Sequence, residues 1–250
     1  VADENNGRIQ KFLPGNTEGL TIISNLASPR DIFVDANGLI YVLEHSDHKV
    51  SKWAADGSSL GIVAGGQGGG NNADQLNYPQ ALFVDIAGAI YIADGENNRI
   101  QKWEFEAIEG TTVADVNNLE DTNEGVYSNN PTDVFVDKQH NIYVADYERI
   151  LKWPSGGAQG EVIINNLDGG AEVFVDSAEH IYVLEQYSHQ VKKYNPGMSA
   201  GIVVAGGNGS GSSADQFNDP RGLFVDEMGS IYTADSRNNR VQKYDSSPQL

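Results

Sequence analysis

The sequence predicts an all-β fold, a six-bladed β-propeller of four-stranded blades, and three observations support this prediction. One phrase recurs five times along the 250 residues, for example as ALFVDIAGAIYIADGENNRIQKW from Ala81. Its copies follow one another at roughly 50 residues, a period typical of propellers and similar arrays. Each copy consists of short strand-like runs between polar turns, and no stretch keeps a helical period of apolar residues. We therefore expect almost no helix.

Every repeat divides into four runs, which we name strands a, b, c and d in chain order. In the repeat that begins at Ala81, strand a is LFVD, strand b is IYIAD, strand c is RIQKW, and strand d follows as TTVADV. Four short strands of this kind make one propeller blade. In three blades a glycine supplies the positive φ that a tight a-to-b hairpin requires, at Gly38, Gly88 and Gly229.

The repeats also correspond across the two halves of the chain. Residues 7–105 align with residues 148–246 without a gap, so the chain contains two copies of a three-blade unit. We expect a single propeller domain over residues 1–250. Its parts are a partial blade at residues 1–26 and blades that start near residues 31, 81, 133, 172 and 222.

Residues 106 to about 143 supply strand d of one blade and strands a and b of the next, and they have no counterpart in the first copy. A further ~38 residues of this kind would complete a six-bladed ring, so we expect the sequence to be a fragment or incompletely determined. A five-bladed ring with a period of about 50 residues is the alternative. It fits less well, because strand c would then occur twice at the closure point.

Composition restricts the partners. The formal net charge of −19 argues against nucleic acid and against anionic membranes, because both bind to concentrated basic surfaces. No apolar run reaches 18 residues, so we expect an acidic, soluble protein without membrane insertion. The absence of cysteine excludes disulfides and thiolate chemistry. An extracellular, secreted location is favoured, while the redox compartment and the oligomeric state stay open.

Two sets of acidic residues recur for structural reasons. An aspartate ends strand a in each of the five repeats and is expected to accept hydrogen bonds from the following turn. A second aspartate ends strand b in four blades and is followed by an arginine, which predicts a repeated ion pair across the b-to-c turn. The first set is Asp35, Asp85, Asp137, Asp176 and Asp226, and the pairs are Asp3 with Arg8, Asp94 with Arg99, Asp146 with Arg149 and Asp235 with Arg240.

The strings YVADYERILKW, YIADGENNRIQKW and VADENNGRIQKF, each followed by a glycine-bearing strand and then by P-x-x-x-F-V-D, resemble the NHL repeat. The resemblance covers essentially the whole chain and implies a β-propeller. For function it implies a range of roles, from RNA binding and protein scaffolding to peptide-amidating lyase activity, among which the fold alone does not choose.

The nearest catalytic relative by this resemblance is peptidyl-hydroxyglycine amidating lyase. In that family an axial zinc is held by histidines, two of which follow a proline at the start of strand a. None of the matching slots here holds histidine, since they are Arg30, Gln80, Thr132, Ala171 and Arg221. The zinc histidines are therefore not matched in the blades that can be compared, and no catalytic constellation is identified.

Two blades replace the recurring Asp and Arg pair, at Leu43–Lys49 and at the equivalent Leu184–Gln190. We expect the b-to-c turns and d-to-a loops to share one face, the top face, where propellers usually bind. The candidate ligand-binding residues there are Glu44, His45, Asp47 and His48 in the first copy and Glu185, Tyr187 and His189 in the second. His48 and His189 are also candidate ligands of a divalent metal ion, the one cofactor that these residues suggest.

The two histidines are expected about 20 Å apart in the ring, which would give two equivalent sites rather than one. The alternative interpretation is that they belong to turn variants inherited with the duplication. Near the axis, Arg30 and Arg221 gather with acidic residues at the entrances of strand a and are further candidates for binding an anionic group. Mutual neutralisation by those acids is the alternative.

The leading functional hypothesis is a non-enzymatic interaction propeller. It would recognise a protein, a glycan (as a lectin does) or a small polar ligand through its top-face loops. One alternative is a metal-dependent lyase or hydrolase with an axial site. Another is a structural extracellular module.

Overall fold

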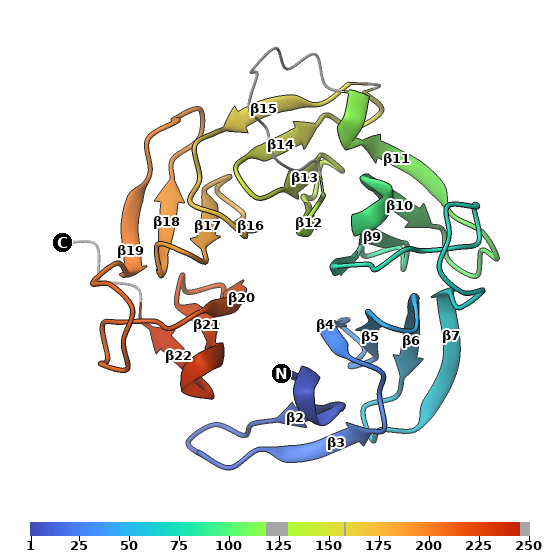
Figure 1. The fold of residues 1–250 in the computed structure, drawn as a ribbon, viewed down its shortest axis with the longest axis horizontal. Helices are drawn as coiled ribbons and strands as arrows, with labels where there is room; N and C mark the ends of the chain where they lie inside the picture. Colours follow the sequence, from blue (N-terminus) through green and yellow to red (C-terminus); the bar gives the residue numbers. More distant parts are fainter. Residues whose placement is uncertain (119–129, 158, 246–250) are drawn as a thin grey trace. The chain divides into compact units, whose positions relative to one another are not determined.

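The computed structural model describes residues 1–118, 130–157 and 159–245. The chain divides into two compact units, Val1–Asn118 and Leu119–Leu250, which we call unit 1 and unit 2 and describe separately (Figure 1). In each unit the described residues form three antiparallel sheets.

Unit 1 follows the predicted order of strands. Its first sheet is β1 (Ala2–Asp3), β2 (Arg8–Lys11) and β3 (Leu20–Ser24). The second is β4 (Pro29–Val34), β5 (Ile40–Glu44), β6 (Lys49–Trp53) and β7 (Ser59–Gly65). The third is β8 (Ala81–Val84), β9 (Ile90–Asp94), β10 (Arg99–Trp103) and β11 (Thr111–Asp115).

Unit 2 repeats this pattern. Its first sheet is β12 (Asp133–Val136), β13 (Ile142–Ala145), β14 (Ile150–Trp153) and β15 (Glu161–Ile164). The second is β16 (Glu172–Val175), β17 (Ile181–Glu185), β18 (Gln190–Tyr194) and β19 (Ile202–Gly206). The third is β20 (Pro220–Val225), β21 (Ile231–Asp235) and β22 (Arg240–Tyr244).

The fold is the predicted all-β, six-bladed propeller, and the five-bladed alternative is wrong, because six sheets are formed. Two sheets have three strands each in the described part of the chain: β1–β3 contain strands b, c and d, and β20–β22 contain strands a, b and c. Helix is confined there to short 3-10 turns, η1 (Glu4–Asn6), η2 (Gly95–Asn97), η3 (Val116–Asn118) and η4 (Ser236–Asn238). None of the described helices is long and apolar enough to span a membrane.

The core lies between neighbouring sheets of each unit. Strand a of one sheet contacts strand a of the next, as β4 does β8 and β16 does β20. Strand b is therefore covered on both sides, and every residue of β5 and β9 is buried. The aromatic residue that closes strand c fills the space between sheets, and Trp103 is almost fully buried. Phe12 differs, because 42% of it is exposed.

A row of cross-strand contacts completes the blades. The aspartate that ends strand a accepts backbone hydrogen bonds from its turn, as predicted; Asp85, for example, accepts from the N–H groups of Ala87 and Ala89, both at 2.9 Å. Lysines of strand c lie over strand b tyrosines, as Lys102 does over Tyr91 at 5.3 Å. The register explains this contact, because these two residues are direct cross-strand partners.

Candidate functional site: the turn faces of the two units

The b-to-c turns and the d-to-a loops meet at one end of the sheets in each unit, which we call the turn face. All four predicted ion pairs form there or beside it, with distances of 2.7 or 2.8 Å. They are Asp3–Arg8, Asp94–Arg99, Asp146–Arg149 and Asp235–Arg240. The recurring pair is therefore structural, as its repetition predicts.

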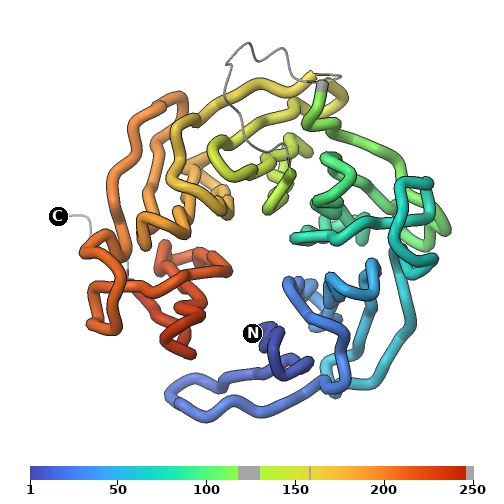
Figure 2. Tube along the Cα trace, viewed as in Figure 1, coloured from blue at the N-terminus to red at the C-terminus, as the bar shows by residue number. Residues whose placement is uncertain are grey.

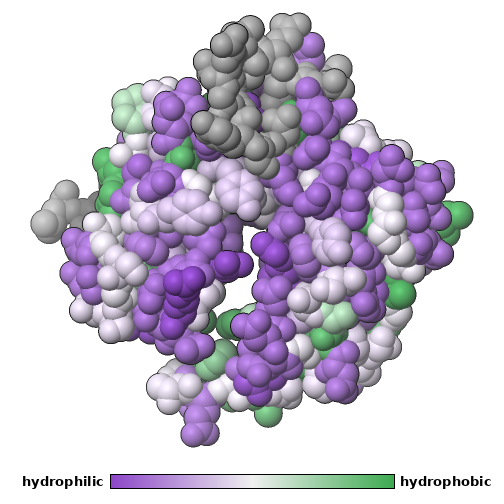
Figure 3. Space-filling view, viewed as in Figure 1, coloured by the Kyte–Doolittle hydropathy of each residue, from purple (hydrophilic) through white to green (hydrophobic). Residues whose placement is uncertain are grey.

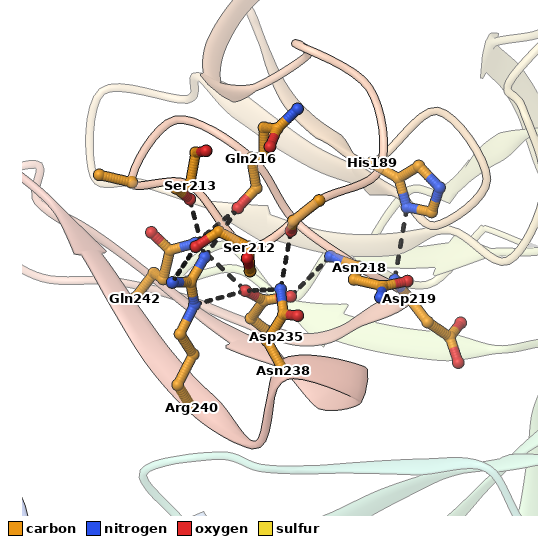
Figure 4. A network of polar contacts seen from close by, with 12 residues as sticks. His189, Ser212, Ser213, Gln216, Asn218, Asp219, Asp235, Asn238, Arg240 and Gln242 are labelled. Carbon is orange, nitrogen blue, oxygen red and sulfur yellow. Dashed lines mark hydrogen bonds and ion pairs between the residues drawn. The ribbon is translucent and has the colours of Figure 1, made fainter.

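In unit 2 this pair also fastens the long loop 206–216 to the next blade (Figure 4). The Arg240 guanidinium donates to the carbonyls of Ser212, Ser213 and Gln216 at 2.7, 2.9 and 3.1 Å. Asp235 is fully buried and accepts the Asn218 backbone N–H at 2.6 Å. In unit 1, Arg99 makes the equivalent contacts with loop 65–75, and Figure 2 shows both loops turning back onto the following sheet. The prediction that turns and loops share a face is supported by these contacts.

Glu44 and Glu185 replace the aspartate in the two exceptional blades, and both carboxylates are buried within their own sheets. Glu44 accepts from the Ser51 hydroxyl at 2.8 Å and from the Ala27 N–H at 3.0 Å. Glu185 accepts from Gln190 at 2.6 Å and from Lys192 at 2.9 Å. These two candidate ligand-binding residues therefore serve their own strands.

In unit 1 the histidines form a cluster with Tyr78. The Nδ1 of His48 accepts the Tyr78 backbone N–H at 3.0 Å, and the two rings meet edge-on at 4.7 Å. The Nδ1 of His45 donates to the Pro79 carbonyl at 2.9 Å, and its ring lies 5.1 Å from that of Tyr78. Asp47 points elsewhere and pairs with Lys49 at 2.6 Å.

The hydrogen bonds define the tautomers of this cluster. A carbonyl only accepts, so His45 carries its proton on Nδ1, whereas His48 accepts a backbone N–H at Nδ1 and carries its proton on Nε2. Burial lowers the pKa of His45, and the positive charge of Arg30 lowers it further against the opposing hydrogen bond to Pro79. His45 is thus kept neutral near pH 7.

In unit 2 the equivalent positions line a pocket of about 230 Å³. Its lining comes from the b-to-c turn after β17, from the d-to-a loop before β20 and from η4. The lining residues are Gln186, Tyr187, His189, Ser210, Asn218, Asp219 and Arg237. Two of the predicted candidates, Tyr187 and His189, are therefore together in one concave site. Hydrophilic side chains cover this part of the surface in Figure 3.

Asp219 is the centre of this pocket. Its backbone N–H donates to the Nδ1 of His189 at 3.4 Å (Figure 4), and its carboxylate accepts from the Gln186 amide. The same carboxylate lies 3.6 Å from Arg221 and 3.5 Å from Arg237. Asp219 has a φ of 53°, a left-handed conformation that aspartate tolerates better than most residues.

The remaining arginine candidates lie at the entrances of strand a, Arg30 in β4 and Arg221 in β20. The acids expected beside them join sheets within a unit: Asp31 accepts from the Leu82 N–H at 2.8 Å, and Glu172 from the Gly222 N–H at 2.6 Å. Asp133 does the same with the Val173 N–H at 2.8 Å. The acids are therefore at least partly committed to backbone hydrogen bonds.

Sequence reasoning missed Asn218, Asp219, Arg237, Ser210 and Gln186. A signal for three neighbouring positions was present in the alignment of the two copies, which pairs Tyr78 with Asp219, Gln80 with Arg221 and Glu96 with Arg237. The exchange of charge lies mostly at the d-to-a loop and η4, whereas the candidate histidines are in the b-to-c turns.

A metal site is not evident in the part of the chain that the structure describes. No group of three or more His, Asp or Glu side chains is placed there to hold an ion. Thr132 and Ala171 occupy two of the positions that correspond to zinc ligands in the lyase family. The Thr132 hydroxyl donates to the Ala171 carbonyl at 2.6 Å, so these two positions connect neighbouring sheets of unit 2.

The blades and their turn-face loops define a β-propeller built from repeated units. The family model described as NHL repeat matches residues 217–244, from the loop before β20 to the end of β22. This match identifies one NHL repeat within the β-propeller fold, at residues 217–244. No curated protein sequence matches the chain.

Solved structures of similar fold include one described as a nidogen/laminin complex, with 16% identity, 96% of this chain and 86% of that chain covered, and a TM-score of 0.75. A streptogramin B lyase is 14% identical, with 89% and 70% covered and a TM-score of 0.56. A catalytically inactive virginiamycin B lyase from Staphylococcus aureus with quinupristin is 11% identical, with 89% and 71% covered and a TM-score of 0.57. At these identities the likeness shows the fold alone.

Proposed function

We propose that the chain is a non-enzymatic interaction propeller that recognises a protein partner through the turn face of unit 2. The observation that carries the proposal is the pocket around Asp219, flanked by two prominent side chains. Tyr187 is 59% exposed, and the side chain of Arg237 is 72% exposed. Tyrosine and arginine are the residue types that most often dominate protein interfaces.

The scaffold beneath the pocket supports this role. Asp235 and Arg240 hold the loop before β20, so the loop is positioned before a partner arrives and less ordering entropy is lost on binding. A propeller of similar fold is present in a nidogen/laminin complex, so this architecture is compatible with protein recognition. A glycan or a small polar ligand would use the same surface and is distinguished by the test.

The test passes a cell extract over the immobilised full chain and over two immobilised charge-reversal variants. The proteins that each of the three retains are then compared. Arg237→Glu changes the pocket, and Lys138→Glu makes the same charge change in the exposed turn between β12 and β13, at the opposite end of the sheets. We expect a partner that the wild type and Lys138→Glu retain and that Arg237→Glu loses. Tyr187→Ala should lose the same partner.

Retention that is equal for all variants would contradict the proposal, because the pocket would then have no part in binding. A parallel extract is treated with glycosidases first. Loss of retention after that treatment would assign recognition to a glycan and overturn the protein-partner proposal.

A further inference from the structure

We propose that the unit 2 pocket binds a carboxylate group, supplied by an acidic side chain of the partner protein. This inference rests on the proposed function and deepens it by naming the chemistry of recognition. It follows from the hydrogen-bonding groups of the pocket that internal contacts leave available.

His189 presents a donor. Its Nδ1 accepts the Asp219 backbone N–H, so the ring proton is on Nε2, the nitrogen directed away from that contact (Figure 4). No hydrogen bond of Nε2 is formed within the described residues. A neutral histidine in this tautomer offers an N–H to the pocket and no acceptor.

Asn218 presents a second donor. The Ser210 hydroxyl donates to its Oδ1 at 3.1 Å, which uses the acceptor end of the amide. The backbone N–H of Asn218 is used as well, by the buried carboxylate of Asp235. The two hydrogens on Nδ2 are therefore the part of this side chain that a ligand can engage.

Two arginines face the one carboxylate that lines the pocket, Arg237 within the lining and Arg221 beside it. Asp219 carries one negative charge, and Arg221 and Arg237 carry two positive charges within 3.6 Å and 3.5 Å of its carboxylate. Gln186 also donates to this carboxylate, so its acceptor capacity is largely engaged. The Arg237 fork retains donors that suit a bidentate carboxylate.

Tyr187 supplies an apolar wall beside these donors. Its ring lies against Gly169, where an added Cβ would come within 2.2 Å of the ring, and more than half of the residue stays exposed. A ring in this position can cover the aliphatic stem of an acidic side chain while its carboxylate meets Arg237 and His189. The excess of donors over acceptors therefore selects an anion in a chain whose formal net charge is −19.

Unit 1 is the internal control for this inference. It has Tyr78, Gln80 and Glu96 where unit 2 has Asp219, Arg221 and Arg237. It therefore lacks both arginines at these positions and carries a negative charge where Arg237 stands. The carboxylate site should belong to unit 2 alone.

The experiment titrates the full chain with small probes and follows the histidines by NMR after labelling them with ¹³C at Cε1. The probes are Nα-acetyl-glutamate amide, its uncharged isostere Nα-acetyl-glutamine amide, and N-acetylglycine, which carries a main-chain carboxylate. The chain has five histidines, and His189 is assigned with the variant His189→Gln. We expect the glutamate probe to shift the His189 signal with a Kd on the order of millimolar, and the His48 signal to stay fixed.

Variants test the role of the guanidinium. Arg237→Glu should weaken binding of the glutamate probe by about tenfold or more, because a charge-assisted hydrogen bond is lost and a like charge is introduced. Arg237→Lys keeps the charge but not the fork, so it should weaken binding less. Lys138→Glu, which makes the same charge change outside the pocket, should leave the Kd unchanged.

Equal binding of the glutamine probe, or full binding by Arg237→Glu, would overturn the inference. Tighter binding of N-acetylglycine than of the glutamate probe would support carboxylate chemistry but assign it to a chain terminus. If no carboxylate binds while Tyr187→Ala still releases the captured partner, the carboxylate inference fails and the proposed function stands. If Tyr187→Ala and Arg237→Glu both retain the partner, the proposed function itself fails.

Discussion

The turn faces of units 1 and 2 have the same scaffold and different sites. Both long loops form an isolated parallel bridge at equivalent positions, Gly69 with Leu76 and Ser210 with Phe217. Both are held by an arginine that donates to three loop carbonyls. On this common frame, unit 1 presents the ring of Tyr78, and unit 2 presents the carboxylate of Asp219.

The exchange of Tyr78 for Asp219 shows which residues of a duplicated blade can differ between the two copies. At positions 78 and 219 the backbone N–H makes the conserved contact, donating to His48 in one unit and to His189 in the other. Because the contact uses the main chain, the side chain can change without loss of the frame. Asp94 and Asp235, by contrast, contribute their side chains to the frame and are the same residue in both units.

The largest effects are expected from removing those frame aspartates. Asp94→Ala and Asp235→Ala should each lower the free energy of unfolding by about 3 kcal/mol, because each removes a buried carboxylate and leaves a partly buried arginine without its counter-charge and a backbone N–H unpaired. Asp3→Ala removes a partly exposed pair and should cost about 1 kcal/mol or less. Urea denaturation of the three variants measures these differences. Equal losses at all three sites would show that burial does not set the strength of the pair.

The two frame aspartates should respond to pH in opposite directions. Burial raises the pKa of Asp94 above its usual value, against the hydrogen bonds from Asn97, Asn77 and Arg99. Burial also raises the pKa of Asp235. The hydrogen bonds that Asp235 accepts lower it by more, so the pKa of Asp235 lies below the usual value. One donor differs, since Gln242 reaches Asp235 at 3.2 Å, whereas Gln101 donates to the Ala73 carbonyl.

The sign of each effect follows from linkage. The lowered pKa of Asp235 gives stability that is present above the usual aspartate pKa of about 4 and is lost as pH falls through the folded value. The raised pKa of Asp94 means that the folded state holds this proton more tightly than the unfolded state does. The resulting stability is present below the usual pKa of about 4 and is lost as pH rises through the folded pKa. Destabilisation by Asp235→Asn should therefore shrink toward acid, and that by Asp94→Asn should grow. Urea midpoints between pH 3 and 7 measure both trends, and parallel trends would contradict this assignment.

A smaller effect is expected at a position where the units differ inside the core. Thr233 in β21 is fully buried, and its hydroxyl has no hydrogen-bond partner in the described structure, whereas unit 1 has buried Ile92 at this position. Thr233→Val should raise the free energy of unfolding by about 1 kcal/mol, since it removes an unpaired hydroxyl and keeps the shape. Ile92→Val serves as the control and should lower it by about 1 kcal/mol. A loss of stability in Thr233→Val would indicate that the hydroxyl has an unseen partner.

The fold was predictable because its signals repeat. Three signals each occur in several blades: the strand phrases, the aspartates that end strand a, and the Asp and Arg pairs. Because they recur, each could be assigned a structural role from the sequence. The exposure of Phe12 could not be read from the sequence, because the end of strand c has the same motif whether the aromatic residue is buried, as Trp103 is, or exposed.

The site was predictable only in part. His189 and Tyr187 stood out because they break the repeat, and both line the pocket. Asp219 did not stand out, because only glycine would have signalled the left-handed backbone conformation at this position. Arg237 lies in a turn whose sequence follows the repeat, so only the charge difference from Glu96 marks it.

The most direct test of the central claim is to build the unit 2 site into unit 1. The variant combines Tyr78→Asp, Gln80→Arg and Glu96→Arg and is titrated with the Nα-acetyl-glutamate amide probe, with the labelled histidines as reporters. The account predicts that the His48 signal, unresponsive in the wild type, now shifts together with that of His189 and that the number of binding sites rises from one to two. A folded variant in which His48 stays unresponsive, or a wild type in which both histidines respond, would contradict it.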